Sequence, residues 1–296
     1  MPTSVLKKPN QTDAEVKSQV HRYYDATTED YLKYYQTDWH HHMHYGFDRH
    51  LPKGGNPTEH MVRFLAKLAE VKSGDRLLDS GCGVGGSSIF LAKELGCISF
   101  GITLVESQAK LAKGFAAKGK GAGRPLANFL VNDFHTPAFK PESFDVVWAV
   151  ESFDHAIDKA AWVQSMYTLL RPGGRLVIAD GFRGKKPETT QQSESYGRFL
   201  KGWAVPHLCS PEEMESYGAK AGFKMLHGED ITIDVLPHSR AIFRFGLIFI
   251  PIRWLLEKWG ITSSEKLGNA YATFYQYRTL KQKLWTYRAY CFQKPF

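Results

Sequence analysis

Residues 77–88, LLDSGCGVGGSS, decide the fold class of this chain of 296 residues. The stretch opens with apolar residues typical of a buried strand, passes Asp79, and then holds four glycines within six positions. Glycine is needed where a backbone must turn tightly and come close to a ligand. The stretch therefore predicts a strand, a ligand-binding turn and the start of a helix.

Apolar runs and amphipathic segments alternate along the chain around this turn. We expect strands at residues 76–80, 98–102, 127–131, 144–150 and 175–180, another within 223–235, and a last one at 284–293. Helices are expected at residues 59–71, 87–95, 106–118, 159–170 and 211–221. Strands that alternate with helices predict a parallel sheet covered by helices on both faces.

The spacing of the glycines also fits the fingerprint of dinucleotide-binding proteins, so the glycines alone do not identify the ligand. Three further features do. Asp79 precedes the glycines, the strand at 127–131 ends in Asn132-Asp133, and RPGG at 171–174 precedes a later strand. Together these elements resemble the class I S-adenosylmethionine-dependent methyltransferases over roughly residues 59–180 and the elements after them. GITLVESQ, residues 101–108, resembles the segment at the same position in cyclopropane synthases and tocopherol-type methyltransferases.

The resemblance implies an α/β fold with a Rossmann-like, seven-stranded, mostly parallel sheet and S-adenosylmethionine as the cofactor. By position, Gly81 and Gly83 would lie along the methionine part of the cofactor, and Asp79 would orient their turn. Asp133 would accept a hydrogen bond from the adenine amino group, and Phe134 would supply its backbone amide and its ring.

The ribose site departs from the superfamily pattern. Most members have an acid at the end of the second strand, where it holds the ribose hydroxyls. Here Thr103 and Leu104 occupy that place, with Gln108 nearby. A nicotinamide enzyme would normally also carry an Asp or Glu in this region, which counts against an NAD(P)-dependent oxidoreductase.

The candidate catalytic residues follow the fully apolar strand at 144–150. The chain continues as ESFDH, which brings Glu151, Asp154 and His155 to the strand end where such folds bind their substrates. ESFDH resembles the ESxxH of tocopherol-type methyltransferases, which implies that Glu151 is a base or stabilises a carbocation. Asp154 and His155 align with the acid and histidine of cyclopropane-type enzymes. The alternative is that Glu151 caps the next element and His155 is a packed loop histidine.

Residues 18–51 are rich in tyrosine and histidine and are expected to form short helices after a flexible arm. WHHHMHYGF, residues 39–47, would place His40 and His44 on one helical face, but no cysteine or carboxylate cluster accompanies them, and no metal is expected. In the family an aromatic-HxGF segment closes the pocket over the cofactor. The resemblance thus implies an N-terminal helical lid, with Tyr24 and His44 on the cofactor and Tyr23 on the acceptor.

The basic surplus of the chain lies at its C-terminal end. The whole chain has 38 basic and 30 acidic residues, a net charge of +8. Residues 237–296 hold ten of the basic residues and two of the acidic ones, together with 14 of the 40 aromatic residues. A helical cap insertion is expected at residues 237–283, before the last strand.

The cap has four open interpretations. It would roof a lipophilic acceptor, clamp a diphosphate or carboxylate on that acceptor, contact a membrane surface, or be an ordinary solvated basic helix. Arg240 and Arg244 are four residues apart and share one helix face. The expected acceptor-binding residues of the cap are Arg240, Arg244, Trp254, Tyr271, Phe274 and Tyr275.

Composition favours a cytoplasmic protein. The four cysteines form no CxxC pair, and the polar N-terminus does not resemble a signal peptide. The most apolar run, about a dozen residues at 245–256, contains Pro251 and Arg253 and is shorter than the roughly 20 residues that span a bilayer. No transmembrane helix and no nucleic-acid partner are expected, whereas peripheral membrane contact and oligomeric state stay open.

The sequence predicts an arm and lid at residues 1–55, a cofactor-binding core at 56–236, the cap at 237–283 and a final core strand at 284–296. The predicted function is methyl transfer from S-adenosylmethionine to a lipophilic small molecule, neutral or anionic, such as an isoprenoid, a prenyl diphosphate or a phenolic natural product. C-methylation is favoured over O- or N-methylation. An NAD(P)-dependent oxidoreductase and a non-catalytic lipid-binding protein are the alternatives.

Overall fold

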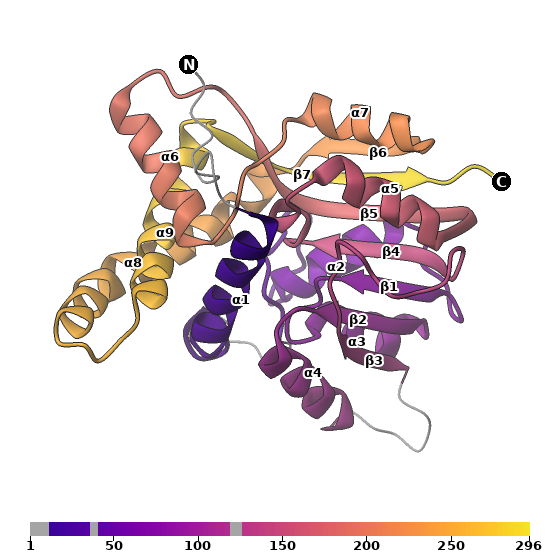
Figure 1. The fold of residues 1–296 in the computed structure, drawn as a ribbon, viewed down its shortest axis with the longest axis horizontal. Coiled ribbons are helices and arrows are strands. Elements are labelled where there is room, and N and C mark those ends of the chain that lie inside the picture. The colour runs from indigo at the N-terminus through magenta and orange to yellow at the C-terminus, as the bar shows by residue number, and fades with distance from the viewer. Residues whose placement is uncertain (1–11, 36–40, 119–125) are drawn as a thin grey trace.

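The computed structural model describes residues 12–35, 41–118 and 126–296 (Figure 1). Residues 1–11 of the expected arm and His40 of the expected lid lie outside the described residues.

Seven strands form one mostly parallel sheet, which confirms the predicted fold class. They are β1 (Arg76–Ser80), β2 (Ile98–Thr103), β3 (Ala127–Val131), β4 (Phe144–Val150), β5 (Leu170–Arg183), β6 (Lys224–Asp230) and β7 (Trp285–Gln293), in the spatial order β3-β2-β1-β4-β5-β7-β6. β7 runs antiparallel to both of its neighbours. The strand order reverses between β1 and β4, and in open sheets ligands bind beyond the C-terminal ends of the strands at this point.

β5 is longer than the strand expected at residues 175–180, because RPGG belongs to it. Leu170 pairs with Phe144, and the register then shifts before the regular pairing of β4 with β5 resumes. Gly173 has a φ of +77°, and its N–H donates to the carbonyl of Lys294 at 2.9 Å. The strand therefore includes RPGG, which was expected to precede it, and passes through an irregularity of the β-bulge type there.

Helices cover both faces of the sheet. They are α2 (Pro57–Leu68), α3 (Gly86–Leu95), α4 (Glu106–Lys118), α5 (Lys159–Leu169) and α7 (Pro211–Ala221), whereas α6 (Thr190–Gly202) packs mainly against the cap. Trp148 packs into a core with α2 and α3, whereas its neighbour Val147 packs with α5 and α7. Both side chains are fully buried, as the alternation of a strand between two covered faces requires.

The remaining helices gather on one side of the sheet. α1 (Asp13–Asp30) continues into the short π-helical turn η1 (Tyr31–Tyr35), and α8 (Thr232–Lys258) and α9 (Ser264–Lys281) precede β7. Figure 1 shows α1 beside α9, with α6 and α8 on either side of α9. A Cβ on Gly246 of α8 would collide with Thr273 of α9, so the two cap helices approach each other closely there.

α8 differs from the expectation in both its start and its length. It begins at Thr232, five residues before the expected cap boundary, and continues through Pro237 and Pro251 to a length of 27 residues. By length and composition alone this helix is apolar enough to cross a membrane, and 17% of its most apolar window is buried. The sequence prediction of no such helix counted only the central apolar run, because proline usually ends a helix.

Candidate active site

The glycine-rich turn after β1 has the backbone shape that its sequence predicts. Gly81 and Gly83 have φ values of +99° and +52°, a region that other residues rarely adopt. The N–H of Gly81 donates to the carbonyl of Ile102 at 3.0 Å, which ties the turn to β2. A Cβ on Gly81 would collide with Ser152, and one on Gly83 would lie 3.3 Å from the sulfur of Met43. Glycine is therefore required where the turn meets β4 and the lid.

A narrow cavity of about 80 Å³ lies over this turn. Its walls include Asp79, Gly81, Gly83, Ser87, Thr103, Leu104, Gln108, Phe134, Glu151 and His155, and from the lid Tyr24, His41, Met43 and His44. Every predicted cofactor residue except Asp133 therefore lines one cavity. The volume is well below the roughly 300 Å³ of a small-molecule pocket, so a ligand of nucleoside size needs the lid segment to open.

The residues along this cavity fit S-adenosylmethionine. The glycine turn leaves room beside backbone amides, and Phe134 provides an apolar ring at the end of β3. Asp79 lies beneath the turn, where burial raises its pKa to about 7 although the Ser88 hydroxyl donates to it at 2.6 Å. At the end of β2 the Thr103 hydroxyl donates to Gln108 Oε1 at 2.8 Å. Hydroxyl and amide groups thus stand where an acid would be expected.

Asp133 lies beside this cavity, and two basic side chains, Lys17 and His135, contact its carboxylate. Lys17 Nζ lies 2.6 Å from one carboxylate oxygen, and His135 Nδ1 lies 2.8 Å from the other. Burial acts to raise the pKa of Asp133, but the hydrogen bonds from His135 and Lys17 outweigh it and hold that pKa below its usual range. The carboxylate is therefore ionised and able to accept a further hydrogen bond, as its predicted adenine contact requires.

α1 crosses the cavity as the predicted lid helix. Besides Lys17, its Thr28 accepts a hydrogen bond from the Gln108 side chain at 3.1 Å, and its Asp25 accepts one from Ser107 at 2.9 Å. Tyr24 reaches His155 from the same helix. One helix thus contacts both ends of the cofactor cavity and a candidate catalytic residue.

Glu151 is the first residue after β4 and has a strained backbone, with a φ of +50°. Its Oε1 accepts hydrogen bonds from the Tyr45 backbone N–H at 2.6 Å and from the Tyr287 hydroxyl at 2.8 Å. Burial, helped by the nearby charge of Asp154, raises its pKa to about 8. Both hydrogen bonds go to Oε1, so within the described residues Oε2 is left for a ligand.

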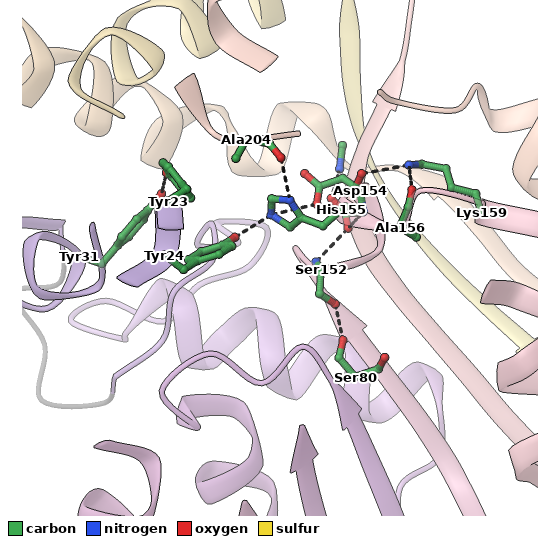
Figure 2. A network of polar contacts seen from close by, with 12 residues as sticks. Tyr23, Tyr24, Tyr31, Ser80, Ser152, Asp154, His155, Ala156, Lys159 and Ala204 are labelled. Atoms are coloured by element: carbon green, nitrogen blue, oxygen red, sulfur yellow. Dashed lines mark hydrogen bonds and ion pairs between the residues drawn. The ribbon is translucent and has the colours of Figure 1, made fainter. Parts of the chain in front are cut away.

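Figure 2 shows His155 between Tyr24 of α1, which points at it, and Ala204, which lies just after α6. His155 Nδ1 lies 3.3 Å from the Ala204 carbonyl, and a carbonyl only accepts, so Nδ1 carries the proton. Nε2 is then the acceptor for the Tyr24 hydroxyl at 2.7 Å. Asp154 Oδ1 lies 3.5 Å from Nε2 and is buried without a hydrogen bond in the described part of the chain.

The loop that carries Glu151, Asp154 and His155 is held by residues that the sequence analysis did not select. The buried carboxylate of Asp180 accepts the backbone N–H groups of Ser152 and Asp154, each at 3.1 Å. Lys159 donates to the carbonyls of Asp154 and Ala156 at 3.0 and 2.9 Å, as Figure 2 shows. Asp180 lies within β5, next to β4, and is the last residue of the strand that the sequence predicts at residues 175–180; that position is the signal that the sequence offers. Burial raises the pKa of Asp180 and lowers the pKa of Lys159.

A second, larger cavity of about 390 Å³ adjoins the first. Tyr24, Met43, His44, Glu151 and His155 line both. The other walls of the larger cavity are mainly aromatic or polar and include Tyr23, Tyr31, Tyr45, Trp203, His238, Ile242, Asn269 and Thr273. Asn269 Oδ1 accepts hydrogen bonds from Tyr23 at 3.0 Å and Trp203 at 3.1 Å, which fixes this wall. Glu151 and His155 therefore stand at the junction of the two cavities.

The cap contributes to the larger cavity through residues other than the predicted ones. Arg240 and Arg244 do share one helix face, but that face is exposed to solvent. α8 turns Val235, Ser239 and Gly246 inward instead. Of the predicted acceptor-binding residues Tyr23 lines the cavity, and Arg240, Arg244, Trp254, Tyr271, Phe274 and Tyr275 are not among its lining residues. Helical spacing predicts which residues share a face and leaves open which face is buried.

The histidines of the lid contact aromatic and backbone groups. The rings of His42 and His44 lie edge to face at 5.0 Å, and His44 Nδ1 lies 2.9 Å from the Tyr45 carbonyl. In the described ranges no group of three or more histidine, cysteine, aspartate or glutamate side chains is arranged to hold a metal ion.

Comparison with known proteins agrees with this geometry. The family model described as "Methyltransferase domain" matches residues 78–178. The chain is 32% identical over 228 residues to the 2-methyl-6-phytyl-1,4-hydroquinone methyltransferase of Synechocystis sp., covering 72% of this chain and 69% of the relative. It is 30% identical over 227 residues to the tocopherol O-methyltransferase of Arabidopsis thaliana, covering 71% of this chain and 65% of the relative.

Solved structures show the same fold at low sequence identity. The cyclopropane synthase MmaA2 of Mycobacterium tuberculosis superposes with a TM-score of 0.78 at 15% identity, covering 94% of this chain and 98% of that one. Geranyl diphosphate C-methyltransferase of Streptomyces coelicolor A3(2), solved with geranyl diphosphate and S-adenosylhomocysteine, has a TM-score of 0.68 at 19% identity, covering 94% and 97%. With the glycine turn, the cofactor cavity and the relatives in agreement, this chain belongs to the S-adenosylmethionine-dependent methyltransferases.

Proposed function

We propose that this methyltransferase acts on a lipophilic small molecule held in the larger cavity, with Glu151 as the residue that acts on the acceptor. The observation that carries the proposal is the position of Glu151, which lines both cavities at their junction. The names of the relatives support the acceptor class, since they act on a phytyl hydroquinone or tocopherol, and a structural neighbour binds geranyl diphosphate.

Methyl transfer is an in-line displacement, in which the enzyme mainly supplies alignment and a pocket that excludes water. S-adenosylmethionine, when bound, supplies an electrophilic methyl group. A bond then forms between the methyl carbon and the acceptor, S-adenosylhomocysteine leaves, and the acceptor loses one proton. We assign that proton to Glu151 Oε2, since Oε1 is occupied by Tyr45 and Tyr287. A pKa of about 8 suits a base that works near neutral pH.

We favour C-methylation of an alkene or an aromatic ring over O- or N-methylation. Methyl addition to such a carbon creates a cation before the proton leaves. Tyr23, Tyr24 and Trp203 line the cavity around Glu151, and aromatic faces stabilise cations. O-methylation of a phenol remains the alternative, because the same carboxylate is placed to accept a phenolic proton, and one of the relatives is an O-methyltransferase by name.

The test is incubation of the protein with labelled S-adenosylmethionine and a panel of prenyl diphosphates, prenylated phenols and amines. We expect label on at least one prenylated acceptor, and NMR of the product to place the new methyl group on carbon. Glu151→Gln should lose turnover and keep its affinity for S-adenosylhomocysteine in calorimetry. A new methyl group on oxygen would mean that the enzyme is an O-methyltransferase and would overturn the preference for C-methylation. Label only on amines that lack a prenyl chain would overturn the acceptor class.

A further inference from the structure

The outward face of the C-terminal half of α8 is apolar and exposed. We call Leu247, Ile248, Ile252 and Leu255 the α8 apolar face; their exposed fractions lie between 39% and 64%. Trp259 and Ile261, in the turn before α9, continue it with exposed fractions of 63% and 65%. Contiguous exposed apolar side chains of this size are uncommon on soluble monomers and mark contact sites for proteins or membranes.

Basic residues flank this face at both ends. Arg240 and Arg244 are exposed about two turns and one turn before it, and Lys258 is exposed at the end of the helix. Residues 235–258 contain four basic residues and one acidic residue, Glu257. An apolar stripe with a basic border complements a bilayer that contains anionic lipids. The acyl chains match the apolar side chains, and the negatively charged headgroups match the basic ones.

The opposite side of α8 is fixed to the body of the enzyme. Arg253 Nη2 lies 2.7 Å from a carboxylate oxygen of Asp30 on α1. Gly246 packs tightly on Thr273 of α9, and His238 and Ile242 line the larger cavity. A membrane-spanning α8 would have to give up these contacts and carry Arg253 into lipid without its partner. The same helix lying flat on a bilayer keeps all of them.

We propose that the α8 apolar face and its basic flank dock this enzyme on the surface of a bilayer that contains anionic lipids. The helix then lies in the plane of the interface, with its apolar side chains among the acyl chains and Arg240, Arg244 and Lys258 at the headgroups. One helix diameter, about 10 Å, separates the lipid from the cavity wall formed by His238 and Ile242. An acceptor dissolved in the membrane reaches the cavity over this short distance. That last step rests on the proposed function; the docking does not.

Sedimentation of the full chain with vesicles tests the docking without any assay of activity. The vesicles are phosphatidylcholine alone, or phosphatidylcholine with one third phosphatidylglycerol. We expect binding to the anionic vesicles that weakens in high salt. Ile248→Glu with Leu255→Glu should lower that binding at least tenfold. Arg240→Gln with Arg244→Gln should lower it about 25-fold, at about fivefold for each basic residue, and only on anionic vesicles.

A matched control is available on the edge strand β6. Met225 and Leu226 have exposed fractions of 45% and 46%, so Met225→Glu with Leu226→Glu adds the same charge at a similar mean exposure. This control should bind as the wild type does. Trp259→Ser with Ile261→Ser lies in a turn, leaves both cap helices intact, and should lower binding in the same direction as the α8 variant.

Several results would overturn the proposal. One is failure of the wild type to sediment with anionic vesicles. Another is that Ile248→Glu with Leu255→Glu, and Trp259→Ser with Ile261→Ser, bind these vesicles as well as the wild type does. Light scattering that shows a dimer, broken by the Ile248 and Leu255 substitutions, would mean that a second copy covers the face. Retention of the protein on membranes through an alkaline carbonate wash would mean that α8 spans the bilayer.

Discussion

Replacing Glu151 by glutamine separates what the carboxylate contributes to the reaction from what its burial costs the fold. An amide oxygen can accept the same hydrogen bonds from the Tyr45 N–H and the Tyr287 hydroxyl, so the shape of the site is kept. The amide cannot take up a proton at neutral pH. We therefore expect turnover to be lost, the affinity for S-adenosylhomocysteine to stay unchanged, and the fold to become more stable.

The gain in stability follows from the pKa of Glu151, which is about 8 in the folded chain and about 4.3 in an unfolded one. Because the folded pKa is the higher one, the unfolded state releases the proton first, and stability is lost as the pH rises from about 4.3 to about 8. Between pH 5 and pH 7 this loss is about 2.5 kcal/mol at about 1.36 kcal/mol per pH unit. The side chain faces a cavity that water can enter, so this value is an upper bound.

Urea unfolding of both proteins at pH 5 and pH 7 measures this effect. The advantage of Glu151→Gln over the wild type should grow by up to about 2.5 kcal/mol between the two pH values. In the wild type, turnover should rise with pH toward about 8, since the ionised carboxylate is the base. A stability difference that does not change with pH would refute the burial argument, and wild-type turnover by the variant would refute the role as base.

Three further predictions concern the cofactor turn, the catalytic loop and the adenine contact. Gly81→Ala forces a side chain into Ser152 at a φ of +99° and should lower the free energy of unfolding in urea by about 1–3 kcal/mol. Its control is Gly114→Ala, where a Cβ meets nothing within 4 Å, and this substitution should raise the free energy of unfolding by about 0.5–1 kcal/mol. Lys159→Met removes the donors to two loop carbonyls and should lower kcat with little change in the KM of S-adenosylmethionine. A rise in this KM as large as the fall in kcat would contradict a positioning role. Asp133→Ala should weaken S-adenosylhomocysteine binding in calorimetry by at least about tenfold, since a hydrogen bond to a charged group contributes about 1.5–3 kcal/mol. Unchanged affinity would remove Asp133 from the adenine site.

The core of the fold could be predicted because its signals are local. A turn that needs positive φ values must be glycine, and the structure has such values at Gly81 and Gly83. The ends of β2 and β3 follow short apolar runs whose limits the sequence shows. Parallel strands bring their C-terminal ends to one edge, so Thr103, Phe134 and Glu151 reach the same cavity although they are far apart in the chain.

The cap and the support of the catalytic loop could not be predicted in this way. α8 passes through two prolines, so its start and length depend on packing against α9 and β7 rather than on local preference. The sequence does not show which face of the helix turns inward, so it points to Arg240 and Arg244 as acceptor residues and not to His238 and Ile242, which line the cavity. Asp180 acts through backbone N–H groups of the loop after β4, and the sequence shows its place at the end of an apolar run but not these contacts.

The reach of α1 over both cavities has a thermodynamic consequence. Lys17 and Thr28 of this helix contact Asp133 and Gln108 of the predicted cofactor site, whereas Tyr24 contacts His155, which also lines the larger cavity. Any ligand that orders the helix lowers the entropic cost of ordering it for the other ligand, and such coupling is reciprocal. The two substrates should therefore bind cooperatively. The acceptor should bind more tightly when S-adenosylhomocysteine is present, and the cofactor product should gain affinity by the same factor when the acceptor is present.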